Sequence, residues 1–136
     1  MSRPAPDAPA AHVVAVPFIN AEEAWFWFIQ AQGARNDGAR VVAGLGAVPR
    51  PCEPLDILKI LERLWRNRML LRDHLLVLKH YGDRMLPPDR HRVREARSAT
   101  LWQQAMDRLE PIFLRRGIIA VPPDFCDDAQ EQRARA

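Results

Sequence analysis

Four arginines lie close together in this sequence, immediately before a segment whose apolar residues recur at helical spacing. They are Arg90, Arg92, Arg94 and Arg97. Guanidinium groups bind phosphate oxygens, and such contacts set affinity for a nucleic acid rather than the choice of base sequence. We therefore expect these four arginines to lie along a DNA backbone.

The segment that follows predicts a long helix with two different faces. Its apolar residues recur at helical spacing and predict a buried face. Glutamine can bond adenine through two hydrogen bonds, and arginine can do the same with guanine. The residues expected to contact DNA from this helix are Ser98, Thr100, Gln103, Gln104 and Arg108. A helical bundle with a solvated basic face is the alternative, because glutamines are common on exposed helices.

Four consecutive aromatic residues, Trp25 to Phe28, form the second unusual feature. Each helical residue advances by about 100°, so no single core face can bury all four rings. One interpretation is a helix packed between two layers. The other leaves Trp25 and Trp27 exposed as a partner-binding anchor, since tryptophan is enriched at interface hot spots. Stacking on single-stranded RNA is less favoured, because arginines are missing nearby.

Motifs that would indicate an enzyme are absent from the sequence. It has no glycine-rich phosphate loop, no nucleophile elbow and no zinc-binding pair of histidines with a glutamate. The histidines and the two cysteines share no metal-ligand spacing; they are His12, His74, His80, His91, Cys52 and Cys126. We expect no enzymatic activity, no cofactor and no metal site.

Charge is distributed unevenly over the 136 residues, although the net charge is only +3. Residues 59–116 carry fourteen lysines and arginines against seven acids, whereas both flanking segments are net acidic. A GC-rich genome can explain frequent arginine, but it does not explain this concentration. A basic block between acidic ends is typical of a nucleic-acid binder.

Length and hydropathy predict one domain, with no membrane span and no signal peptide. Two cysteines 74 positions apart do not indicate a disulfide framework. We therefore expect a cytoplasmic protein.

The elements that must position these residues are all helical. Asn20 predicts a helix start and Gly33 its end, while Pro54 suits the first position of the next helix. Asp73 and Gly82 bound a third, and Pro111 should kink the last. The expected helices are 20–32, 54–69, 73–82, 89–97 and 98–117.

This pattern predicts an all-α fold with flexible ends. The expected organisation is a flexible tail over 1–19, the aromatic helix and a loop over 20–53, a helical DNA-binding module over 54–121, and a second flexible tail over 122–136. On the helix of residues 54–69, the expected buried face contains Leu55, Leu58, Leu61, Trp65 and Met69, with Ile57 and Leu64 beside it.

The segment between Leu75 and Phe113 resembles region 4 of sigma factors. The residues that carry the likeness are Val77-Leu78, Tyr81-Gly82, Ser98, Thr100-Leu101-Trp102 and Ala105-Met106-Asp107-Arg108-Leu109. Residues 89–97 have more arginine and fewer apolar residues than the family pattern. The resemblance implies a helix-turn-helix whose second helix enters the DNA major groove.

Size and layout are also similar to those of phage Q-type transcription antitermination factors and their gene-transfer-agent relatives (GafZ-like proteins). That resemblance implies a factor that binds a promoter-proximal DNA element and loads onto paused RNA polymerase. There it narrows the RNA exit channel, so that terminators are read through. Nascent RNA is a further partner to consider, and the missing cysteine cluster excludes the zinc-binding variety. A promoter-activating helix-turn-helix regulator and a helical protein-interaction module are the alternatives.

Overall fold

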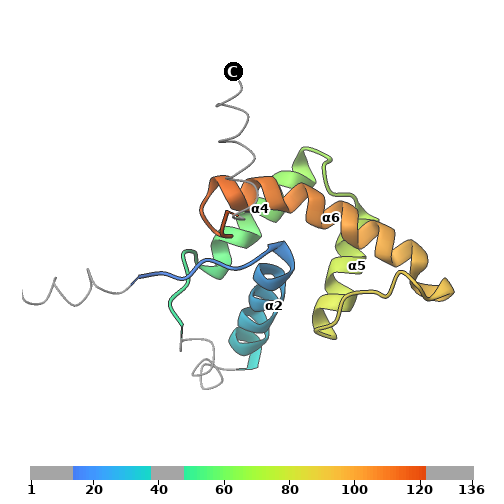
Figure 1. The fold of residues 1–136 in the computed structure, drawn as a ribbon, viewed down its shortest axis with the longest axis horizontal. Coiled ribbons are helices and arrows are strands. Elements are labelled where there is room, and N and C mark those ends of the chain that lie inside the picture. The colour runs from blue at the N-terminus through green and yellow to red at the C-terminus, as the bar shows by residue number, and fades with distance from the viewer. Residues whose placement is uncertain (1–13, 38–47, 122–136) are drawn as a thin grey trace, which may run out of the picture.

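The computed structural model describes residues 14–37 and 48–121, and the regular elements of this part of the chain are helices joined by turns and irregular segments (Figure 1). The expected all-α class is confirmed for these residues. Most of the predicted tails, and residues 38–47 of the predicted loop, lie outside them. The elements are α2 (Ala21–Asp37), α4 (Pro54–Arg66), α5 (Arg72–Asp83), the 3-10 turn η2 (Val93–Glu95) and α6 (Ala96–Arg115).

Helix α2 begins where the sequence predicts and ends later. The Asn20 side-chain oxygen accepts the backbone N–H of Glu23 at 2.9 Å, which caps the first turn. The predicted end at Gly33 is wrong, because the helix continues to Asp37. A glycine inside a helix costs only about 1 kcal/mol, and the neighbouring Ala31 and Ala34 are both buried.

Helix α4 starts at Pro54 as predicted, but it buries a different face. The Asp56 carboxylate accepts the Glu53 backbone N–H at 2.8 Å. The buried residues are Ile57, Ile60, Leu61 and Leu64, whereas Leu55, Trp65 and Met69 are each about half exposed. The charged residues of this helix do share one face, but the apolar arc opposite them is wider than the core contact, so Trp65 at its edge stays half exposed.

Helix α5 begins at Arg72, and its first turn is closed by a histidine rather than by Asp73. The Nδ1 atom of His74 accepts the Leu71 backbone N–H at 3.0 Å. The helix passes through Gly82 and ends at Asp83. A Cβ atom at Gly82 would lie 2.9 Å from both Ile29 Cγ1 and Trp25 Nε1, so glycine allows α2 to pack closely here.

The short helix expected over residues 89–97 is only the single turn η2, which leads directly into α6. Ser98 therefore lies inside the first turn of α6 and does not cap it. The helix continues through Pro111 to Arg115, and Gly117, with φ of 72°, follows its end as predicted.

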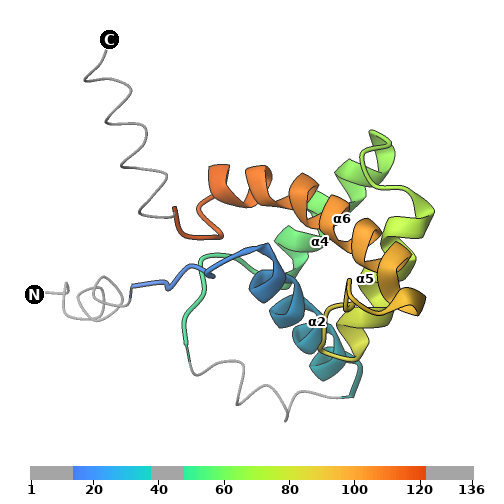
Figure 2. The ribbon, with the colours of Figure 1, turned by 45° about the vertical axis from the view of Figure 1, so that its right-hand side comes forward.

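The core lies where α2 packs against α5 and α6 (Figures 1 and 2). The chain ahead of α2 also belongs to it, because Phe18 is completely buried. Its backbone N–H donates to the Ile118 carbonyl at 2.9 Å, and its carbonyl accepts the Ala120 N–H at 2.8 Å. The predicted tail of residues 1–19 is thus wrong at its inner boundary.

Candidate nucleic-acid interface

Helix α6 presents the two faces that the sequence predicts. Its buried residues are Trp102, Ala105, Met106, Leu109 and Phe113. The outward residues Thr100, Gln103, Gln104 and Asp107 are exposed, and Arg108 is half-buried. A rigid helix therefore holds the predicted polar row, because its opposite side is fixed in the core.

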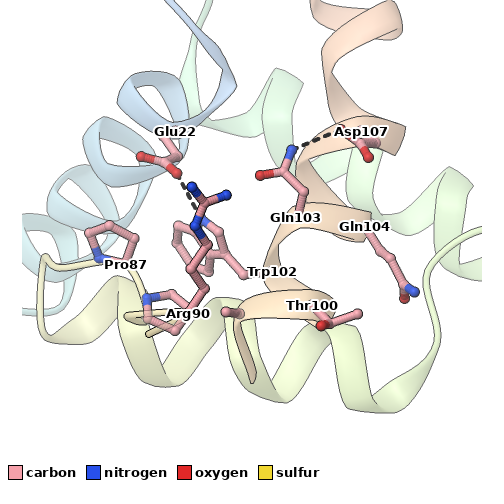
Figure 3. A pocket seen from close by; sticks show the side chains of 10 residues that line it. Glu22, Pro87, Arg90, Thr100, Trp102, Gln103, Gln104 and Asp107 are labelled. Atoms are coloured by element: carbon pink, nitrogen blue, oxygen red, sulfur yellow. Dashed lines mark hydrogen bonds between the residues drawn. The ribbon is translucent and has the colours of Figure 1, made fainter. Parts of the chain in front are cut away.

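A groove of about 420 Å³ runs along this row, between α6, the start of α2 and the segment ahead of η2 (Figure 3). Trp102 forms part of its wall, and its Nε1 donates to a Glu22 carboxylate oxygen at 2.9 Å. The Phe26 ring stacks on the same indole with centroids 5.6 Å apart. The groove residues are Glu22, Pro87, Pro88, Arg90, Ala99, Thr100, Trp102, Gln103, Gln104 and Asp107.

The two glutamines of the row have different surroundings. Gln103 donates to the Asp107 carboxylate at 2.9 Å on the exposed surface. The Gln104 side chain points away from Gln103 (Figure 3). Its side-chain oxygen lies 2.8 Å from Nε2 of the buried His74. Gln104 is therefore already engaged in a contact that joins α6 to α5.

The hydrogen bonds of His74 define which ring nitrogen carries hydrogen. Because Nδ1 accepts the Leu71 N–H, the hydrogen of the neutral ring lies on Nε2, which then donates to Gln104. Arg108 Nη1 is 3.1 Å from the same Nε2 and cannot donate to a nitrogen that is itself a donor. Arg108 thus packs against the histidine instead of facing the groove.

The four arginines ahead of α6 are all exposed, and two of them have acidic neighbours. The Nε atom of Arg92 lies 3.7 Å from Oδ2 of Asp89, and its Nη1 atom lies 3.8 Å from Oε2 of Glu95. Arg97 forms an ion pair of 3.1 Å with Asp73 of α5. Exposed pairs of this kind contribute about 0–1 kcal/mol, so these guanidinium groups can still exchange partners.

The predicted site residues are therefore divided between two places. Arg90, Thr100, Gln103 and Gln104 line the groove. Arg97 and Ser98 lie at a separate hollow beside α5, with Asp73. Arg94 is exposed and forms no ion pair within the described ranges.

Two carboxylates in the groove were missed by the sequence reasoning. Glu22 reaches it from α2, 80 positions before Trp102, and no local pattern links the two residues. Asp107 lies one helical turn beyond Gln103, so spacing alone could have identified it. Both carboxylates oppose the approach of a phosphate to the groove that Arg90 also lines.

The aromatic run is packed between two layers, which is the first of the two interpretations. Trp25 is only 4% exposed, and its Nε1 donates to the Leu78 carbonyl at 3.0 Å. The expectation of an exposed anchor at Trp25 is wrong, because this ring fills the space between α2 and α5. Trp27 is partly buried and packs on Phe18, with ring centroids 5.2 Å apart.

The segment between α5 and α6 differs from the turn that the resemblance implies. Residues 84–95 separate the two helices, whereas a helix-turn-helix uses three or four residues. The arginine-rich stretch has no apolar face to bury, and it forms only the turn η2. The sigma-like helix-turn-helix is thus not confirmed.

No family model, no curated protein and no solved structure matches this chain. Within residues 14–37 and 48–121, none of the helices is long and apolar enough to cross a membrane. The same part of the chain contains no group of three histidine, cysteine or acidic side chains able to hold a metal ion.

Proposed function

We propose that this protein is a DNA-binding transcription factor that associates with RNA polymerase. The observation that carries the proposal is the exposed polar row of α6, which lies beside the exposed arginines of residues 90–97. Polar side chains on a rigid helix can reach base edges, and neighbouring arginines can hold the adjacent phosphates.

The geometry favours DNA contacts at the N-terminal half of α6. Thr100 and Gln103 are exposed there next to Arg90, whereas Gln104 is engaged by His74. Recognition helices commonly use their N-terminal residues for base contacts. Gln103 is therefore the proposed base-reading residue, and Arg90 and Arg94 are the proposed phosphate contacts.

Antitermination is the favoured form of this function, and it rests on the resemblance to Q-type factors and their gene-transfer-agent relatives. A chain without a catalytic motif can act on polymerase only through binding. Activation of initiation at a promoter is the neighbouring form. The two differ in whether terminator read-through or the number of initiated transcripts changes.

A surface for polymerase is available at the corner between α4 and α5. Trp65, Met69 and Leu71 are each about half exposed there, although they are large and apolar. Exposed apolar residues of this kind mark protein-binding surfaces when they lie together. This corner replaces Trp25 as the proposed anchor, and it equally suits a helical interaction module that binds no nucleic acid.

Binding to duplex DNA, measured by fluorescence anisotropy between 50 and 200 mM salt, tests the proposal. Each phosphate contact removed by Arg90→Gln or Arg94→Gln should reduce the slope of log K against log salt by about 0.9 for every sequence. Gln103→Ala should cost about 1–3 kcal/mol on the cognate site alone. Lys79→Gln, which removes an exposed charge paired with Asp83, is the matched control.

Unaltered binding in all three site variants would contradict the assignment of this face to DNA. If the protein then bound polymerase through Trp65 without binding DNA, the interaction module would be the better description.

A further inference from the structure

A second groove, of about 240 Å³, lies between α4 and the C-terminal end of α6. It is lined by Arg63 of α4, by Arg115 of α6 and by Arg116, with Ile60 and Ile112 as its apolar residues. Figures 1 and 2 both show α4 crossing behind α6. Three arginines thus line one hollow that has no acidic residue among its lining residues.

These arginines have no anionic partner within the chain that the structure describes. None of the three takes part in an ion pair or a side-chain hydrogen bond among residues 14–37 and 48–121. Their helix neighbours three and four positions away also include no acid. Glu110 of α6 lies on another side of that helix, in a hollow with Asn20 and Glu22.

The negative ends of the helix dipoles explain this cluster only in part. Cations near a helix C-terminus are favourable by about 0.3–1 kcal/mol. The last carbonyls are nevertheless occupied by backbone donors, as the bonds from Asn67 N–H to Arg63 and from Arg116 N–H to Ile112 show. The guanidinium groups are therefore not used to satisfy the helix ends.

The positive surface extends beyond the groove along α4. Lys59, Arg63 and Arg66 follow one another at four and three positions, which places them on one face of the helix. The same face also carries Glu62, at pairing distance along the helix from Lys59 and Arg66, so only Arg63 of these three cations has no acid three or four positions away.

We propose that this groove, defined by Arg63, Arg115 and Arg116, binds the phosphodiester backbone of a nucleic acid. Arginine suits this role because its planar group donates two parallel hydrogen bonds to phosphate oxygens. The site does not depend on base reading by α6, since a backbone contact carries no sequence information. Duplex DNA and single-stranded RNA present the same chemistry and are separated by experiment.

The test uses the full chain with Arg63, Arg115 and Arg116 all changed to glutamine. A variant with Arg72→Gln, Lys79→Gln and Arg84→Gln removes the same charge from α5 and its end, outside the groove. Circular dichroism and thermal unfolding establish that both variants fold. Salt-dependent anisotropy is then measured with a random-sequence 20-base-pair DNA duplex and with a single-stranded 20-nucleotide RNA.

The groove variant should lose up to about 2.7 from the salt slope on duplex DNA, or about 2.1 on the single strand, at about 0.9 and 0.7 per contact. The α5 variant should lose clearly less. A loss on one nucleic acid alone identifies the source of the phosphates. Equal losses in the two variants, or no loss on either nucleic acid, would overturn the proposal.

An unchanged slope in the Arg90 and Arg94 variants would refute the DNA role of the α6 face without affecting this groove. If the groove variant kept its sequence preference and its salt slope, the groove proposal would be refuted and the DNA role of the α6 face would be unaffected. The two proposals therefore fail separately.

Discussion

Single side chains determine how closely the helices of this protein approach one another. At Gly82 the added Cβ of any other residue would press on the Ile29 side chain and on the Trp25 ring. The Trp25 ring cannot move away freely, because it is buried and donates to the Leu78 carbonyl. The contact between α2 and α5 thus depends on the absence of one methyl group.

Gly82→Ala should destabilise the protein by about 1–3 kcal/mol, as overpacking of a core usually does. Gly33→Ala is the matched control, because a Cβ there has nothing within 4 Å. It should stabilise α2 by about 0.5–1 kcal/mol, since alanine favours helix. Chemical unfolding measures both, and a Gly82→Ala variant as stable as the parent would show that the helices are less tightly packed.

The two adjacent glutamines of α6 should respond differently to truncation. Gln104→Ala leaves the buried His74 Nε2 without its acceptor and should cost about 1–3 kcal/mol. Gln103→Ala loses only an exposed contact with Asp107 and should stay within about 0.5 kcal/mol. Urea unfolding of the pair distinguishes them, and equal stabilities would contradict the His74 contact.

At the scale of elements, local patterns predicted helix starts better than helix packing. Asn20 and Pro54 begin their helices because capping and ring geometry act within one turn. For α4 the apolar arc was predictable, but which part of that wide arc is covered by the core was not, because this depends on how α2 packs against it. The burial of α6 was predictable, since its apolar residues occupy one stripe.

In the candidate site, too, features set within one helix were predictable, and contacts between distant parts of the chain were not. Exposure of Thr100 and Gln103 follows from the period of α6. The contact of Gln104 with His74 joins residues 30 positions apart in the sequence, and the contact of Glu22 with Trp102 joins residues 80 positions apart. Local patterns do not predict either contact. The basic groove joins Arg63 to Arg115 across two helices, so no spacing in the sequence indicates it.

The segment that leads into α4 carries a thiol with an altered acidity. Burial, then the nearby Asp56 and Glu53 carboxylates, raise the pKa of Cys52 from 9.0 to about 11, while Arg50 acts in the opposite sense. Each of the first three disfavours the thiolate. The folded protein therefore keeps this proton where an unfolded chain releases it.

Alkylation of Cys52 at pH 8 should be at least about tenfold slower in the folded protein than in urea, because the thiolate is the nucleophile. The experiment uses a Cys126→Ser background, so that one thiol is followed. Since the folded pKa is raised, the stabilising effect is complete below pH 9 and is lost as pH rises toward about 11. Equal rates in the folded and unfolded chains would contradict this.

On the scale of the whole molecule, the two ends of the described chain meet. Phe18 lies in the core and pairs its backbone with Ile118 and Ala120. Phe18→Ala should cost about 3–5 kcal/mol, whereas the neighbouring Ile19→Ala, at a residue 76% exposed, should change stability little. Thermal unfolding compares them, and a small effect at Phe18 would place residues 14–19 outside the core.

The charges of the molecule are also arranged at this scale. Acidic residues Glu22, Asp107 and Glu110 lie where α2 faces α6, while Arg63, Arg115 and Arg116 gather between α6 and α4. A nucleic acid should therefore approach from the α4 side and from the arginines ahead of α6. The remaining apolar corner at Trp65 is left for a protein partner.

A transcription assay with purified RNA polymerase tests the proposed function most directly. The template carries the cognate promoter region and a downstream intrinsic terminator, and the fraction of transcripts that pass the terminator is measured. We predict that the protein raises this fraction only when the promoter-adjacent DNA is present. Unchanged read-through and unchanged initiation, together with no binding to polymerase, would contradict the account.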